Sequence, residues 1–101
     1  MATSTIKGQL LTKLGEGSSS TEYNLTIPDI SAYEWLVFSY ATSNIVTLPT
    51  RVFKSLGYCN VLLPNVFNSE NYKATFQYIS DTSIKVTTSQ GSMIRIFGFN
   101  N

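Results

Sequence analysis

Apolar and polar residues alternate with a two-residue period along most of this chain. In residues 22–27, for example, Tyr23, Leu25 and Ile27 alternate with polar residues, and residues 72–78 repeat the pattern. Successive side chains of an extended strand point to opposite faces, so this alternation predicts strands with one buried face. No stretch of a dozen residues combines helical spacing with helix caps. The chain is therefore predicted to be all-β.

Glycine, proline and short polar runs divide the alternating pattern into separate strands. The predicted strands cover residues 6–14, 22–27, 35–41, 45–48, 58–63, 72–78, 84–87 and 93–99. Seven or eight short strands at this spacing predict a single domain over residues 1–101, an antiparallel β-sandwich with a jelly roll as one variant. The last three strands are predicted to form a meander.

Other segments are predicted to connect or fill this sandwich. Residues 15–20 have the composition of a flexible polar turn, and residues 50–56 could form a single helical turn that ends at Gly57. Residues 35–41 are apolar on both faces, which predicts a central strand. Among the aromatic residues, Trp35 and Phe76 are predicted to be buried in the core.

Composition limits the classes of function. Charged residues make up 13% of the 101 residues, about half of the roughly 25% in a typical soluble protein, and the net charge is +1. The basic residues are scattered, so no footprint for nucleic acid is present. No apolar run approaches the roughly 20 residues of a membrane span. A low-charge domain of this kind is predicted to be soluble when expressed alone and prone to self-association.

Few catalytic designs remain open to this sequence. Histidine is absent, and Cys59 is the only cysteine, so it is predicted to be a buried thiol without a disulfide or zinc cluster. A carboxylate pair of the glycosidase kind is the remaining catalytic alternative. Its candidates, Glu16, Glu22, Asp29, Glu34, Glu70 and Asp81, occur mostly in turns or at strand ends. We therefore predict no enzyme activity, no cofactor and no metal site.

Candidate ligand-binding residues occur where predicted strands end. The aromatic rings of Tyr40 and Tyr58 lie beside polar turns, where each could face a sugar or a neighbouring subunit. The loop of residues 65–71 carries amide and carboxylate groups that match sugar hydroxyls, although an ordinary solvated loop has the same composition. The predicted ligand site consists of Tyr40, Tyr58, Asn65, Asn68, Glu70 and Asn71.

The last strand carries a charged residue in apolar surroundings. Arg95 stands between Ile94 and Ile96, and Phe97 and Phe99 follow on the same face of the strand. That face is either an amphipathic surface or a contact between subunits. Arg95, Phe97 and Phe99 are therefore the candidate oligomer interface.

Several segments carry a resemblance to a known family. Tyr23–Ile30 followed by Tyr33–Val37, then Ile45–Lys54, the hairpin of residues 72–92 and the closing Ile94–Phe99 all match in order and pattern. The chain resembles the C-terminal head domains of bacteriophage tail-fibre and baseplate receptor-binding proteins. The resemblance covers most of the chain from Tyr23 onward.

This resemblance implies a location, an assembly and a partner. It implies a β-sandwich that forms a homotrimer at the tip of a virion fibre and adheres to the host cell by binding a bacterial surface glycan or protein. The alternative is a purely structural virion protein, such as a capsid-decoration or baseplate subunit, with no ligand beyond its assembly partners.

Overall fold

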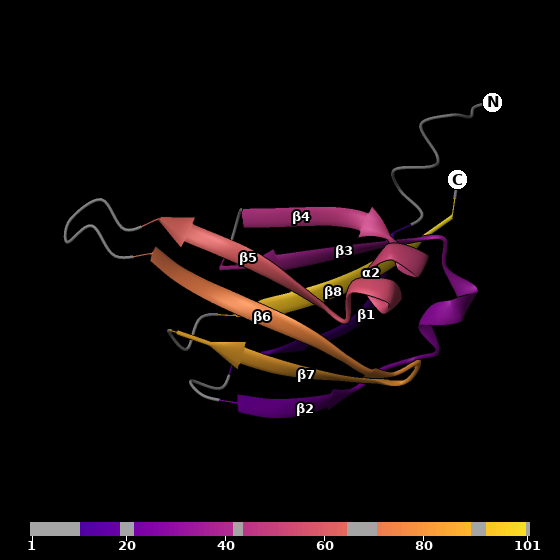
Figure 1. Ribbon diagram of the computed structural model, residues 1–101, viewed down its shortest axis with the longest axis horizontal. Helices are drawn as coiled ribbons and strands as arrows, with labels where there is room; N and C mark the ends of the chain where they lie inside the picture. Colours follow the sequence, from indigo (N-terminus) through magenta and orange to yellow (C-terminus); the bar gives the residue numbers. More distant parts are fainter. Residues whose placement is uncertain (1–10, 19–21, 42–43, 65–70, 90–92, 101) are drawn as a thin grey trace.

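The computed structural model describes residues 11–18, 22–41, 44–64, 71–89 and 93–100 (Figure 1). They form two four-stranded antiparallel sheets packed face to face, which confirms the predicted all-β sandwich. The strands are β1 (Thr12–Gly17), β2 (Glu22–Thr26), β3 (Trp35–Tyr40), β4 (Asn44–Pro49), β5 (Tyr58–Pro64), β6 (Asn71–Ser80), β7 (Ser83–Thr88) and β8 (Ile94–Phe99). The first sheet has the order β1-β8-β3-β4 and the second the order β2-β7-β6-β5.

The connections cross between the sheets on both long sides of the sandwich. On one side β1 leads to β2, and on the other β4 leads through the helix α2 (Thr50–Leu56) to β5. A jelly roll also pairs its first strand with its last and its second strand with its seventh. Here, however, β3 and β4 form a hairpin within one sheet, whereas the corresponding jelly-roll strands lie in different sheets.

The predicted meander at the C-terminal end is wrong in its last step. β6 and β7 form a hairpin, but β8 does not pair with β7. Instead β8 lies in the other sheet between β1 and β3. The alternation of apolar residues fixes which side chains face inward, but it does not select the sheet to which a strand belongs.

The inward faces of both sheets form one hydrophobic core. β3 is a central strand as predicted, and its residues Leu36, Phe38 and Tyr40 are fully buried. The ring of Phe38 packs against Phe76 of the opposite sheet at a centroid distance of 4.7 Å. The predicted burial of Phe76 is therefore confirmed.

Strand β1 extends into a segment that the sequence predicted as a polar turn. Gly15 and Gly17 belong to β1, and their lack of a side chain lets β2 approach closely. A Cβ on Gly15 would lie 3.0 Å from side-chain atoms of Leu25 and Ile27, and one on Gly17 would lie 2.6 Å from the Tyr23 hydroxyl oxygen. These glycines therefore serve close packing, not a turn.

Helix α2 confirms the predicted helical turn and its end. Its Phe53 is fully buried against Phe38, with ring centroids 4.9 Å apart. Gly57 follows with a φ of +88°, a conformation that residues with a Cβ rarely adopt, and its N–H donates to the carbonyl of Phe53. The helix therefore closes one end of the sandwich through a single aromatic anchor.

Cys59 lies on the inward face of β5 and is buried, as predicted. Burial raises the pKa of its thiol to about 11, because the thiolate loses solvation there. Within the described residues, no helix is long and apolar enough to span a bilayer.

Candidate functional site

The described residues of the predicted ligand site do not come together. Tyr58 pairs with Gln77 at one end of the β5–β6 hairpin, whereas Asn71 pairs with Pro64 at the other. Six residues of extended strand separate these ends by about 20 Å. Asn65, Asn68 and Glu70 lie outside the described residues. The loop that joins β5 to β6 thus begins far from Tyr58.

Tyr40 is also unsuited to the role that the sequence assigned to it. Its side chain has an exposed fraction of zero and belongs to the core between the sheets. The expectation of a ring facing a ligand is therefore wrong for Tyr40. The residue ends β3 on the inward face, and the inward alternation of Leu36 and Phe38 extends to it. Tyr58, by contrast, is 53% exposed.

The three candidate interface residues share the outer face of the first sheet. Arg95, Phe97 and Phe99 pair with Ser39, Val37 and Trp35 of β3. The guanidinium of Arg95 lies 3.6 Å from the carboxylate of Glu16 on β1. These residues form a mixed apolar and charged strip that remains partly exposed.

A surface hollow of about 410 Å³ lies at the end of the same face. It is lined by Tyr33, Glu34, Trp35, Pro49 and Arg51, and we call it the Trp35 hollow. Its volume falls within the range of roughly 300–1,000 Å³ that small-molecule sites have in proteins. It combines an indole ring, a carboxylate and a guanidinium.

The indole of Trp35 is held in place on the outer face of the sheet. Trp35 begins β3 and is opposite Pro49 on β4 and Phe99 on β8. Its ring is stacked on that of Phe99, with centroids 6.0 Å apart and planes 11° from parallel. The predicted burial of Trp35 in the core is wrong, because this residue is on the outer face and partly exposed.

Hydrogen bonds from two directions fix the backbone beside the ring. The Thr50 hydroxyl donates to the carbonyl of Tyr33 at 2.7 Å, and the Thr50 N–H donates to the carbonyl of Glu34 at 2.9 Å. The side chain of Asn100 accepts from the Glu34 N–H at 2.7 Å and donates to the carbonyl of Ala32 at 3.1 Å. This part of the hollow is therefore rigid before any ligand arrives, which lowers the entropic cost of binding.

The polar side chains of the hollow offer complementary chemistry. Arg51 is exposed, and within the described part of the chain its guanidinium makes no ion pair or hydrogen bond. A guanidinium presents up to five donors, and the Glu34 carboxylate presents acceptors only. Two neighbouring hydroxyl groups of a sugar need both donors and acceptors as partners. The ring carbons of the sugar need an apolar surface such as indole.

A second hollow of about 360 Å³ lies on the other sheet, lined by Glu22, Tyr23, Asn24, Ile79, Ser83 and Lys85. Its two charged groups are paired, with the Lys85 ammonium 3.0 Å from the Glu22 carboxylate. The hydroxyl of Tyr23 is buried and has no hydrogen-bond partner among the described residues, and burial raises its pKa. A ligand would have to displace an ion pair here, so this hollow is the weaker candidate.

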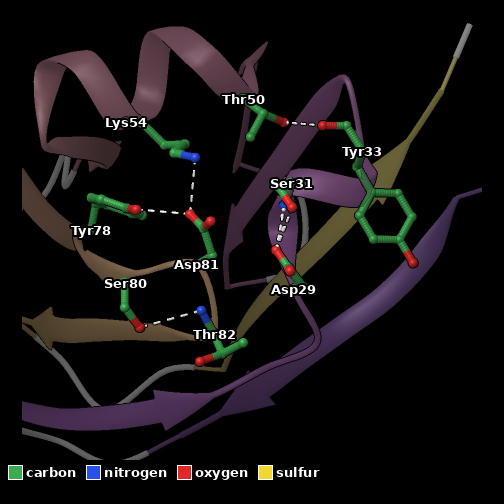
Figure 2. Close-up of polar contacts among 9 residues, drawn as sticks. All are labelled: Asp29, Ser31, Tyr33, Thr50, Lys54, Tyr78, Ser80, Asp81 and Thr82. Atoms are coloured by element: carbon green, nitrogen blue, oxygen red, sulfur yellow. Dashed lines mark hydrogen bonds and ion pairs between the residues drawn. The ribbon is translucent and has the colours of Figure 1, made fainter.

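A third polar cluster joins α2 to the β6–β7 turn (Figure 2). One oxygen of Asp81 accepts from the Tyr78 hydroxyl at 2.8 Å and lies 3.0 Å from the Lys54 ammonium. These two contacts hold the pKa of Asp81 below its usual value and raise the pKa values of Lys54 and Tyr78. Each of the three polar groups has a partner within the cluster, which indicates that the cluster is a structural clamp between α2 and the β6–β7 turn.

The described carboxylates make contacts in separate parts of the structure. Glu16 contacts Lys13 and Arg95, Glu22 contacts Lys85, and Asp29 caps the short 3-10 helix η1 (Ile30–Ala32) by accepting from the Ser31 N–H at 2.9 Å. Across the part of the chain that the structure describes, no cluster of three or more His, Cys, Asp or Glu side chains could hold a metal ion.

Sequence reasoning assigned the residues of the Trp35 hollow to other roles. Trp35 is the first residue of a segment that is apolar on both faces, so its alternation did not reveal which face was outward. The alternation of faces along the strand could have shown that Trp35 points outward. Trp35 and Leu36 lie on opposite faces, and Leu36 shares its face with Phe38 and Tyr40. Arg51 carried no motif.

Comparisons of the chain with protein-family models, with curated proteins and with solved structures found no match.

Proposed function

We propose that this protein is a phage-type receptor-binding head that adheres to the host cell by binding a bacterial surface glycan in the Trp35 hollow. The observation that carries the proposal is the union, in one preformed hollow, of a ring held by stacking, a guanidinium and a carboxylate. The resemblance in sequence pattern to fibre heads supports it. So does the sandwich, a scaffold that carries binding sites at its ends and faces.

The proposed mode of binding uses each group for one task. The apolar face of a sugar ring packs against the partly exposed indole of Trp35, which is stacked on Phe99. The Arg51 guanidinium donates to sugar oxygens, and the Glu34 carboxylate accepts from sugar hydroxyls. No bond is made or broken, so the protein acts as a binder and not as an enzyme. In the proposed setting it is a virion component at a tail or fibre tip.

Two substitutions test this site directly. Trp35→Ala removes the stacking surface, and Arg51→Gln removes the charge while retaining a donor. Each should weaken retention on host cells or on a glycan array by roughly 5- to 30-fold, since each lost contact is worth on the order of 1–2 kcal/mol. The thermal midpoint of Arg51→Gln should stay within a few degrees of wild type, because Arg51 is exposed.

Lys73→Gln is the matched control for Arg51→Gln. It also removes an exposed positive charge while retaining a donor, but Lys73 lies outside the hollow, on β6. Retention should be unchanged in this variant. Equal losses in Arg51→Gln and Lys73→Gln would contradict the assignment to the Trp35 hollow. Absence of specific retention by the wild-type chain on every bacterial surface tested would instead support the structural virion subunit.

The resemblance also implies a homotrimer, which is the alternative to the two-copy arrangement proposed below. Three copies would bring three hollows to one receptor surface and raise the overall avidity. The mass of the protein in solution tests this number against the two-copy arrangement that follows.

A further inference from the structure

Exposed hydrophobic side chains concentrate on one side of the sandwich. Among the described residues, seven large hydrophobic side chains are exposed, and five of them lie on the consecutive elements β4, α2 and β5. These five are Ile45, Val52, Leu56, Tyr58 and Leu62. Exposed apolar side chains that gather on one side of a protein, unlike singly scattered ones, are typical of protein–protein contact sites.

Strand β5 has further properties of a pairing edge. It is the last strand of its sheet and pairs only with β6 among the described strands, so alternate N–H and C=O groups along it point away from the sheet. It contains no charged residue, and no register shift interrupts its pairing with β6. Charges and bulges are the usual devices that prevent such an edge from pairing.

The sequence of β5 is complementary to its own copy. Tyr58, Asn60 and Leu62 share the outer face, and Tyr58 and Leu62 are each 53% exposed. If two β5 strands lie antiparallel with Asn60 opposite its own copy, each Tyr58 faces a Leu62 of the other chain. That pairing places an aromatic ring against an aliphatic side chain at both ends. Residues 58–62 form the pair, and Pro64, which has no N–H to donate, falls outside it.

We propose that β5 is a self-association edge, which pairs antiparallel with β5 of a second copy about a two-fold axis through Asn60. The partner must be a strand, because only a strand matches a row of backbone donors and acceptors. A second copy meets this requirement with no like charges on the paired strands and with matching apolar groups at both ends. Pairing joins the two four-stranded sheets into one continuous sheet. The proposal is independent of the glycan site.

The mass in solution and one isosteric substitution test the proposal. Light scattering over a concentration series should approach twice the 11.2 kDa of a single chain. Asn60→Asp places two carboxylates opposite each other on the axis and should raise the dissociation constant on the order of tenfold or more. The Thr75 hydroxyl, which donates to the Asn60 side chain at 2.6 Å, can still donate to the new carboxylate, so the monomer should remain folded.

Asn24→Asp is the matched control, because it adds the same charge to the outer face of β2, the opposite edge strand of the same sheet. Its dissociation constant should equal that of wild type. A monomeric wild type at every concentration would overturn the proposal and leave the edge to a strand of another protein. A mass of three chains would also overturn it, as would equal weakening by both Asp variants.

A cross-link tests the position of the axis. Cysteines opposite each other in antiparallel strands lie within disulfide distance. Asn60→Cys should therefore form a covalent dimer on mild oxidation, whereas Asn24→Cys should not at equal concentration. The wild-type chain serves as the blank, since Cys59 is buried. Equal cross-linking of both variants would show random collision and overturn the proposed register.

Discussion

The two long sides of the sandwich close in different ways. On the β1–β2 side, a register shift between Lys13 and Gly15 distorts β1, and ion pairs join Lys13 to Glu16 and Lys85 to Glu22. On the other side, β4 and β5 contain no charged residue. Charges and bulges of the first kind protect an edge strand from pairing with another chain. The contrast supports the proposed self-association at β5.

The largest difference in stability is expected between variants of a buried and of an exposed hydrophobic residue on α2. Phe53→Ala should lower the free energy of unfolding by about 3–5 kcal/mol, because Phe53 is fully buried against Phe38. Leu56→Ala should lower it by about 0.5 kcal/mol or less, because Leu56 is 61% exposed. Denaturant unfolding at low protein concentration measures both. A large loss in Leu56→Ala would show that this side is packed within the single chain and would weaken the contrast.

Substitution of one glycine on each long side of the sandwich compares how closely other residues pack against it. Gly17→Ala should cost about 1–3 kcal/mol, because the new methyl group meets the Tyr23 hydroxyl at 2.6 Å on the β1–β2 side. Gly57→Ala should cost about 1 kcal/mol for a different reason, since nothing lies within 4 Å but φ is +88°. Thermal unfolding of both variants provides the measurement. A neutral Gly17→Ala would show that β1 and β2 are not in close contact there.

The pH dependence should be the smallest of the effects on stability. The hydrogen bond from Tyr78, followed by that from Lys54, holds the pKa of Asp81 below its value in the unfolded chain. Its contribution is therefore complete above a pH of about 4 and is lost as the pH falls through the folded pKa. Asp81→Asn should lose less stability than wild type in that acidic range. Parallel midpoint curves for the two proteins would contradict a role for this clamp.

Much of the fold could be predicted from local pattern, because parity along a strand decides burial. The alternation in β2 and β6 and the end of α2 at Gly57 were all readable in this way. The position of β8 could not be predicted, since pairing with β3 instead of β7 depends on contacts between residues far apart in the sequence. The continuation of β1 through Gly15 and Gly17 depends likewise on side chains of β2.

The candidate site was less predictable than the fold. Tyr40 and Tyr58 both lie near strand ends, but one is buried and the other exposed, and Asn71 lies at the far end of the hairpin from Tyr58. The Trp35 hollow is assembled from the ends of β3 and β4 and the start of α2. The side chains of Thr50 and Asn100 fix it through hydrogen bonds to backbone groups 17 and 66 residues away in the sequence. No local motif encodes such contacts.

Amide hydrogen exchange measured at several protein concentrations tests the contrast between the two edges most directly. In a single chain, half of the N–H groups of β5 and of β2 point away from their sheet and should exchange rapidly. As the concentration rises, the outward amides of residues 58–62 should become protected, whereas those of residues 22–26 should keep exchanging at the same rate. Equal exchange at the two edges over the whole concentration range would contradict the account.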